Sequence, residues 1–359
     1  MFELRRANKD FGMTNAALRV KLDSIRCNEE GDMLMNVFCH NRHLLHLPRR
    51  ELEDGEWVEN PDKPDRIELL KQSLSELDGI EIVHPRDFDE STLLLVHDSE
   101  YLGWMRMRCD ALAPDKEYFP EVFGYDRMFD TGTPLMKNSL SAALDSVSTA
   151  LSALEDVVNG NRVAYALSRP PGHHASKGIG GGYCYFNNAA IAARYFQGTT
   201  AARVSILDLD FHHFNGTQDI FYDDPTVFCV SLHGDPKVHY PWISGFEKET
   251  GEGEGKGYTM NIPLPTGTEG KEYKEALERA LLAIENFGPE LLIISLGTDT
   301  HAEDPIGAFS LVDEDYEDVA MLIMSLNLET LIVHEGGYNP QASARAATRF
   351  VKGVLASTG

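Results

Sequence analysis

The chain has 359 residues, of which 42% are hydrophobic and 30 are glycine, and this composition is typical of a globular enzyme. Its 57 acidic and 32 basic residues give a net charge of −25, so nucleic acid is not expected as a partner, because its phosphates would be repelled. No apolar run reaches the roughly 18 residues that span a membrane, and residues 1–6 lack the apolar core of a signal peptide, so we expect a cytoplasmic protein with no membrane partner.

The N-terminal half of the chain shows an irregular pattern. Residues 1–33 carry little strand signal, and we expect them to extend a catalytic core that covers residues 37–356 within a single domain, 1–359. Helices are predicted at Pro64–Leu77 and Lys137–Val158.

Three stretches are predicted to be loops. Arg49–Lys63 and Pro114–Pro134 are rich in proline, glycine and charge, and loops of that length often form functional rims. The stretch Gly251-Glu-Gly-Glu-Gly-Lys-Gly is predicted to be a flexible acidic loop, because it lacks the Lys-Ser/Thr pair and the helix of a phosphate-binding loop.

After residue 160 the predicted strands and helices alternate. Strands rich in Val, Ile and Leu are predicted at 163–168, 203–208, 226–232, 290–296 and 329–334. Helices are predicted at 187–197, 270–287, 313–325 and 341–356. Apolar runs that are separated by helices indicate a parallel sheet covered on both faces, which is an α/β fold.

Polar side chains follow three of these strands. Asp210 and His212 lie two residues apart in Asp208-Leu-Asp-Phe-His-His-Phe-Asn-Gly, so an extended chain would point both to the same side. Asp299 follows another strand, and the carboxyl ends of parallel strands meet in one crevice. Carboxylate oxygen and imidazole nitrogen suit zinc, and three protein ligands leave a position open for water or substrate. The five cysteines form no CxxC pair, so a cysteine zinc site is not expected.

One metal is favoured over two. A two-metal site needs further bridging carboxylates. Phe214, two residues after His212, cannot ligate a metal, and the residue two after Asp299 is His301. His301 stays open as an additional ligand or a contact of the substrate.

A histidine pair, His173 and His174, follows the first strand in Arg169-Pro-Pro-Gly-His-His-Ala. Hydrolysis near neutral pH needs a group that takes a proton from water and returns one to the leaving amine, and histidine suits both steps. Each histidine needs a partner on its other nitrogen, for which Asp208 and Asn215 are the candidates. A carboxylate partner favours the charged imidazole more than an amide does, so the two pKa values could be tuned apart.

Aromatic residues are expected to complete the site. Tyr338 lies just past the last strand, and its hydroxyl could donate to the oxyanion of a tetrahedral intermediate. Tyr183 and Tyr240 could form two walls of a narrow tunnel, with Gly182 letting an unbranched alkyl amide approach the backbone.

These motifs resemble those of the histone deacetylase and acetylpolyamine amidohydrolase family, within the arginase–deacetylase superfamily. The resemblance spans about residues 165–340 in family order. It rests on Arg169-Pro-Pro-Gly-His-His-Ala, Gly181-Gly-Tyr-Cys-Tyr-Phe-Asn-Asn, Asp208-Leu-Asp-Phe-His-His-Phe-Asn-Gly-Thr-Gln, Ser231-Leu-His-Gly-Asp-Pro, Ser295-Leu-Gly-Thr-Asp-Thr and Glu335-Gly-Gly-Tyr. The Ser231 motif and the segment 37–77 are similar to the bacterial acetylpolyamine enzymes in particular.

The resemblance implies a three-layer α/β/α sandwich with an eight-stranded parallel sheet. It also implies one zinc per chain, with His174 as general base and acid, His173 as its electrostatic partner and Tyr338 as the group that polarises the carbonyl. The implied zinc ligands are Asp210, His212 and Asp299. A structural potassium ion would be held, partly through backbone oxygens, by Asp208, Asp210, His212, Ser231 and Leu232.

Two departures from the family pattern concern packing and selectivity. Phe214 stands where the family has glycine, so the local packing must differ. Ile306 stands where some polyamine-selective relatives have an acidic residue. Selectivity for a cationic substrate would then come from acidic rim residues, namely Glu117, Glu121, Asp126 and Asp130, of which Asp126 resembles a substrate-gripping residue of lysine deacetylases.

The function that the resemblance implies is zinc-dependent removal of acetyl from N-acetylated primary amines by metal-activated water. Acetylpolyamine is the first expected substrate and acetyl-lysine the second. Hydrolysis of another small amide or thioester, and silent binding of acetylated ligands, stay open. We also expect a homodimer in which residues 1–33 or 114–134 close the mouth of the tunnel.

Overall fold

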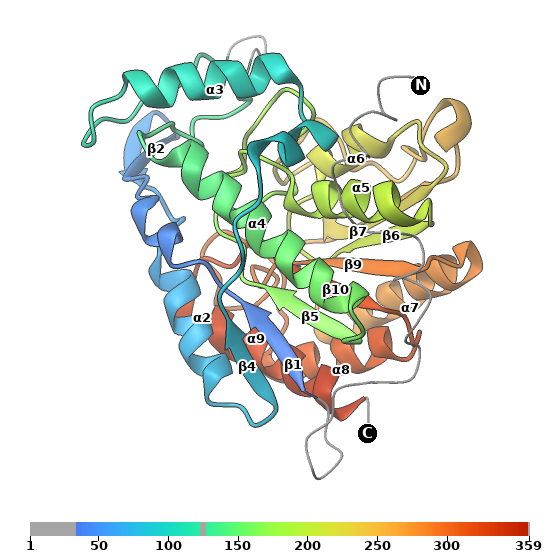
Figure 1. The fold of residues 1–359 in the computed structure, drawn as a ribbon. Coiled ribbons are helices and arrows are strands. Elements are labelled where there is room, and N and C mark those ends of the chain that lie inside the picture. The colour runs from blue at the N-terminus through green and yellow to red at the C-terminus, as the bar shows by residue number, and fades with distance from the viewer. Residues whose placement is uncertain (1–33, 123–126, 358–359) are drawn as a thin grey trace.

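The computed structural model describes residues 34–122 and 127–357. Its centre is an eight-stranded sheet in the order β4-β1-β5-β10-β9-β6-β7-β8, with all neighbouring strands parallel (Figure 1). The strands are β1 (Met35–Phe38), β4 (Ile80–Val83), β5 (Val163–Ala166), β6 (Val204–Asp208), β7 (Val227–Gly234), β8 (Thr259–Leu264), β9 (Leu291–Leu296) and β10 (Thr330–His334). The predicted α/β fold with an eight-stranded parallel sheet is confirmed.

Helices cover both faces of this sheet, which gives three layers (Figure 1). One face packs against α2 (Asp65–Ser75), α7 (Gly270–Phe287), α8 (Asp313–Met324) and α9 (Pro340–Ala356). The other face packs against α4 (Ser139–Val158), α5 (Asn188–Thr200) and α6 (Asn215–Phe221), and α3 (Ser99–Ala111) packs against α4. Short 3-10 helices are η1 (Asn41–Leu45), η2 (Glu90–Leu95) and η3 (Gly253–Gly255), the last within the predicted glycine loop.

Strand side chains alternate between two hydrophobic cores. In β5, Val163 and Tyr165 belong to the core under α2 and α9, while Ala164 and Ala166 belong to the core under α4 and α5. Because both faces are buried, the strands have continuous apolar runs instead of an alternating pattern.

The five predicted strands correspond to β5, β6, β7, β9 and β10, and each predicted helix lies within three residues of an observed one at both ends. Three strands of this sheet escaped prediction. β1 and β4 have only four residues each, too few for a clear period. β8 contains Pro263, which is tolerated because β8 lies at the edge of the sheet.

The prediction of a long loop at Arg49–Lys63 is wrong. This stretch contains an antiparallel hairpin of β2 (Arg50–Glu53) and β3 (Glu56–Glu59). Its turn residues, Asp54 and Gly55, have φ values of 49° and 85°. Positive φ at both central residues is the signature of a type I′ hairpin, and an Asp-Gly pair is its usual sequence.

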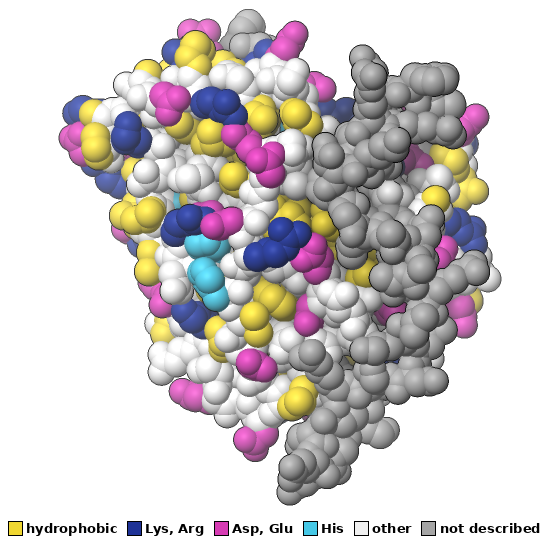
Figure 2. Space-filling view, in the orientation of Figure 1, with side chains coloured by type: hydrophobic (Ala, Val, Ile, Leu, Met, Phe, Trp, Pro, Cys, Tyr) yellow, Lys and Arg dark blue, Asp and Glu magenta, His cyan; other side chains and the backbone are white. Residues whose placement is uncertain are grey.

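Some expectations fall outside the described residues: the extension at 1–33, its part in a dimer, and Asp126. Within the described part, no helix is long and apolar enough to cross a membrane. Figure 2 shows acidic and basic side chains interspersed on the described part of one face, so the acidic excess is spread there and not gathered in one patch.

Phe214, the residue that replaces glycine, is fully buried in the core under α5. Its ring packs edge-on against His213, with ring centroids 5.2 Å apart. The phenyl group therefore fills the core where α6 begins, and it does not enter the site.

Replacement of Phe214 by alanine should lower the free energy of unfolding by about 3–5 kcal/mol, since it leaves a cavity in a closed core. Denaturant unfolding monitored by circular dichroism would measure this loss. The control Leu282→Ala, at a side chain 60% exposed on α7, should cost less than about 1 kcal/mol. A Phe214→Ala loss as small as that of the control would contradict the packing role.

Candidate active site

The loops that follow four neighbouring strands meet at the carboxyl edge of the sheet. They come from β5, β10, β9 and β6, which are adjacent in that order. In register, Asp208 at the end of β6 lies opposite Ser295 of β9 and Ser231 of β7. The strand pairing therefore brings together polar residues that are far apart in the sequence.

Asp210, His212 and Asp299 form a buried donor cluster whose ligand atoms all lie within 4.8 Å of one another. His212 Nδ1 lies 3.2 Å from Asp210 Oδ1 and 2.9 Å from Asp299 Oδ2. The other carboxylate oxygens accept backbone N–H groups, Asp210 Oδ2 from Gly336 and Asp299 Oδ1 from Phe211. Each carboxylate is thus held with one oxygen directed at the imidazole.

A positive charge would stabilise the two carboxylates of this cluster, and a divalent metal fits its donor atoms. Burial and then the charge of Asp210 raise the pKa of Asp299 to about 7. Burial lowers the pKa of His212, but the Asp210 and Asp299 carboxylates outweigh it and raise that pKa to about 9. Two buried carboxylates facing one nitrogen are costly unless a cation lies between them. The oxygen and nitrogen donors are those of a zinc site.

The histidine pair lies beside this cluster. His173 Nδ1 is 3.0 Å from Asp208 Oδ2, and His174 Nδ1 is 2.7 Å from Asn215 Oδ1. Because an amide oxygen only accepts hydrogen bonds, His174 donates through Nδ1 and keeps the lone pair of Nε2 free. The structure therefore brings each histidine to the partner proposed from the sequence.

The two histidines have opposite pKa shifts. Burial lowers the pKa of His173, but Asp210 and Asp208 outweigh it and raise that pKa to about 10. Burial, and then the charge of His173, hold the pKa of His174 well below its usual range. His174 is therefore neutral near pH 7 and able to accept a proton, while His173 is the charged member.

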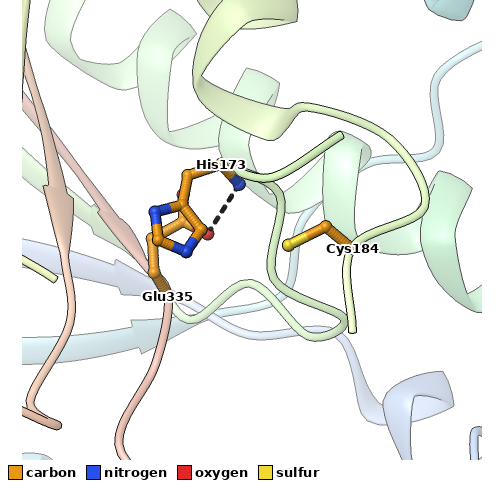
Figure 3. Close-up of side chains that lie close together, drawn as sticks. All are labelled: His173, Cys184 and Glu335. Atoms are coloured by element: carbon orange, nitrogen blue, oxygen red, sulfur yellow. Dashed lines mark hydrogen bonds between the residues drawn. The ribbon is translucent and has the colours of Figure 1, made fainter. Parts of the chain in front are cut away.

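Glu335 holds the backbone of the loop that carries His173 and His174. Its carboxylate accepts the backbone N–H of His173 at 3.2 Å (Figure 3). It also accepts the backbone N–H of Gly172, at 2.6 Å. Cys184 points toward both residues, but its thiol donates to the Gly182 carbonyl, and burial raises its pKa well above the usual range. A protonated thiol is a poor metal ligand. Glu335 is thus a support for the histidine loop.

Aromatic side chains enclose the site. Tyr183 meets Tyr338 edge-on at 5.4 Å between ring centroids, and Tyr240 meets the His174 ring edge-on at 5.0 Å. Burial raises the pKa of Tyr338 well above its usual range, so its hydroxyl stays protonated and can donate.

Asp130 ties the two walls together. Its Oδ2 accepts from the Gly182 N–H at 2.5 Å and from the Tyr240 hydroxyl at 2.6 Å. Gly182 has a φ of 55°, and a Cβ there would collide with the His174 ring. Glycine is therefore required where the backbone passes over the histidine.

The prediction of an acidic rim needs correction. Glu117 does not face a substrate path: its side chain is 2% exposed and ion-paired to Arg49 and Arg50 at 3.3 and 3.6 Å. The Asp130 carboxylate already accepts hydrogen bonds from Gly182 and Tyr240. Glu121 is exposed. Contacts with residues distant in the sequence therefore take up two of the four predicted rim carboxylates, Glu117 and Asp130, and no local sequence pattern indicates these contacts.

Three other predicted residues differ in how close they lie to the donor cluster and to Tyr338. Ile306 is half-buried, and its N–H donates to Asp304 Oδ1 at 2.9 Å, while Asp304 Oδ2 accepts from the Tyr338 N–H at 2.6 Å. His301 does not reach the donor cluster, because its Nε2 lies 3.0 Å from Asp313 Oδ1. Leu232 is buried next to Ser231, whose hydroxyl lies 2.8 Å from His233 Nδ1.

Three residues near the site escaped the sequence reasoning. Glu51, on the hairpin strand β2, lies 3.3 Å from the Tyr183 hydroxyl, and the Asp54-Gly55 turn could have placed it. Asp62 and Arg66 form a buried ion pair at 2.6 Å with the i, i+4 spacing of a helix start. That spacing was a usable signal.

The fold and the site together define a three-layer α/β protein with a candidate metal centre at the carboxyl edge of its sheet. The chain matches the histone deacetylase domain over residues 60–354. It is 37% identical to acetylpolyamine amidohydrolase 2 of Pseudomonas aeruginosa over 87% of this chain and 96% of the relative. It is 36% identical to the acetylpolyamine amidohydrolase of Mycoplana ramosa over 89% of this chain and 99% of the relative.

Among solved structures, the crystal structure of acetylpolyamine aminohydrolase from Burkholderia pseudomallei superimposes with a TM-score of 0.86 and 34% identity. It is matched over 100% of its chain by 90% of this one. The chain therefore belongs to the histone deacetylase family, and it is a hydrolase of that deacetylase and amidohydrolase group.

Replacement of Asp299 by asparagine should abolish stoichiometric zinc binding, because it removes one charge from a three-residue donor set. We expect a loss of affinity of at least about a hundredfold, more than the removal of an outer support costs. Metal analysis after dialysis and competition with a zinc chelator would measure it.

The matched control is Asp313→Asn, which removes a carboxylate near His301 and not in the cluster. This control should keep one zinc per chain. Wild-type zinc affinity in Asp299→Asn would rule out Asp299 as a ligand.

Proposed function

We propose that the protein is a zinc-dependent amidohydrolase that removes acetyl from N-acetylated primary amines, acetylpolyamines first and acetyl-lysine second. The observation that carries this proposal is a buried Asp210–His212–Asp299 donor set beside a neutral His174 and a protonated Tyr338. The acetylpolyamine relatives support the same substrate class.

Zinc held by the three donors would supply Lewis acidity toward a carbonyl and toward water. His174, with Nδ1 fixed by Asn215, takes the proton of the attacking water at Nε2. Tyr338 donates its hydroxyl hydrogen to the carbonyl oxygen as negative charge develops there. His174 then returns the proton to the leaving amine, and acetate is the second product.

His173 and Asp208 influence the protonation of His174 in this step. A charged His173 beside Asp208 and Asp210 opposes a second permanent charge on His174. His174 therefore accepts a proton only during the reaction and is ready to give it up.

In the proposal, potassium is held by Asp208, Ser231 and Leu232, together with Asp210 and His212.

A cationic substrate is favoured by Glu51. Burial raises the pKa of this carboxyl to about 7, and the described residues offer it no basic partner. Its Oε1 lies 3.3 Å from the Tyr183 hydroxyl, which supports a position beside the proposed tunnel. A distal ammonium group of an acetylpolyamine would supply the positively charged partner that Glu51 lacks.

Replacement of Tyr338 by phenylalanine should lower kcat by about 10²–10³, because it removes the hydrogen-bond donor to the oxyanion. Zinc content and hydroxamate binding should stay close to wild type. Steady-state kinetics with metal analysis would measure both. A kcat near that of wild type would overturn the role of the hydroxyl.

N-acetylputrescine should be hydrolysed by the zinc-loaded enzyme with a higher kcat/KM than an acetyl-lysine peptide. Glu51→Gln should raise the KM for N-acetylputrescine about tenfold, since a charge-assisted hydrogen bond contributes about 1.5 kcal/mol or more. The KM for an uncharged N-alkylacetamide should not change.

The control Glu53→Gln, on the same strand but exposed, should leave both KM values unchanged. A peptide preference would point to an open mouth and a deacetylase of acetyl-lysine. Zinc-bound protein that hydrolyses neither substrate would favour another amide or thioester, or silent binding.

A further inference from the structure

Asp62 lies between two arginines in the interior of the protein. Its Oδ1 accepts from Arg66 Nη1 at 2.6 Å and from Arg169 Nε at 3.0 Å. All three side chains are essentially unexposed. His46 lies 3.7 Å from the other carboxylate oxygen, but burial and then the charge of Arg169 lower its pKa to about 3, so it is neutral. Among the described groups around these arginines, Asp62 supplies the negative charge that they share.

Arg66 holds the loop that carries Tyr338. Its Nε donates to the Gly337 carbonyl at 2.6 Å, and its Nη2 donates to the Glu335 carbonyl at 2.7 Å. The guanidinium also lies 4.5 Å from the centre of the Tyr338 ring. One planar side chain thus fixes the backbone on the N-terminal side of the tyrosine and contacts its ring as well.

Arg169 holds the start of the loop that carries the histidine pair. Its guanidinium donates to the carbonyls of His43 and His46, at 2.7 and 2.9 Å, and to the Asp62 carbonyl at 2.6 Å. Only three residues separate it from His173. The loop with the proposed base is therefore anchored to the N-terminal segment through this one side chain.

We propose that Asp62 is a positioning residue that sets the relative placement of Tyr338 and His174. This inference rests on the roles proposed for those two residues. Two buried guanidinium groups without a carboxylate between them would repel each other and separate. Each arginine would then move the loop it holds, and the distance between the hydroxyl donor and the base would change.

Asp62→Asn keeps the size of the side chain and removes the charge. In the full-length, zinc-loaded enzyme, kcat for N-acetylputrescine should fall about 10- to 100-fold, the cost of a displacement of about 1 Å at the reacting groups. The KM should stay within about twofold, because the Asp62 side chain bonds to Arg66 and Arg169 and not to Tyr183 or Tyr240. Zinc content should remain one per chain.

A second readout does not depend on turnover. A 3-fluorotyrosine introduced at position 338 should show one sharp fluorine resonance in the wild-type background. In the Asp62→Asn background this resonance should shift or broaden, because the ring loses its fixed contact with Arg66. If the wild type hydrolyses no acetylated amine, the proposed function fails, and the fluorine spectrum still decides the inference.

The matched control is Asp145→Asn. Asp145 is also a buried carboxylate paired with an arginine, Arg42, at 2.6 Å, but among the described contacts its carboxylate meets only Arg42 and His40 and no residue of either loop. The control should lower the melting temperature yet leave kcat and the fluorine resonance unchanged. If Asp62→Asn behaves like this control, Asp62 is only structural and the inference is overturned.

Arg66→Lys provides the test if Asp62→Asn does not fold. Lysine keeps the charge beside Asp62 but cannot donate in the planar fork that reaches two carbonyls. It should reproduce the loss of kcat and the change in the fluorine resonance. Wild-type values for both would overturn the inference.

Discussion

Buried negative charge at the carboxyl edge of the sheet is the constraint on which the site depends. Asp208, Asp210, Asp299 and Glu335 are at most 1% exposed, and each isolated charge would be costly there. Backbone N–H groups donate hydrogen bonds to these carboxylates. The charged His173 and the His212 imidazole compensate their negative charge. Even the glycines follow from it, because a Cβ at Gly297 or Gly336 would collide with the Asp210 carboxylate. The backbone therefore wraps closely around the carboxylates, and this fixes where a cation can lie.

The sequence carried enough information for the central part of this arrangement. Long apolar runs identify strands buried on both faces, and polar residues directly after such runs identify the edge where loops converge. Asp210, His212 and Asp299 could be placed together by that reasoning, as could the pairs His173–Asp208 and His174–Asn215. These contacts follow because each motif lies directly after a strand that the local apolar pattern identifies, and because parallel strand ends converge at one edge.

Other contacts could not be predicted, because they depend on distant pairing. Nothing near Glu117 indicates that Arg49 and Arg50 would take up its charge, since those residues are brought close only by the hairpin. The contact of Arg169 with Asp62 spans more than 100 positions. Short strands such as β1 and β4 likewise gain their stability from neighbours in the sheet and not from their own four residues.

The N-terminal segment thus has two separate tasks in the proposed enzyme. Asp62 and Arg66 reach inward to the loops of the reaction, whereas Glu51 on the hairpin reaches the outer tunnel wall at Tyr183. Glu51 lies on β2, and the hairpin turn and β3 separate it from Asp62. A change in the hairpin can therefore alter which amine is held at the tunnel wall while the buried ion pairs stay intact. The Tyr183 contact and the arginine contacts share no hydrogen-bonding atom, so a substitution of Glu51 removes no hydrogen bond of Asp62.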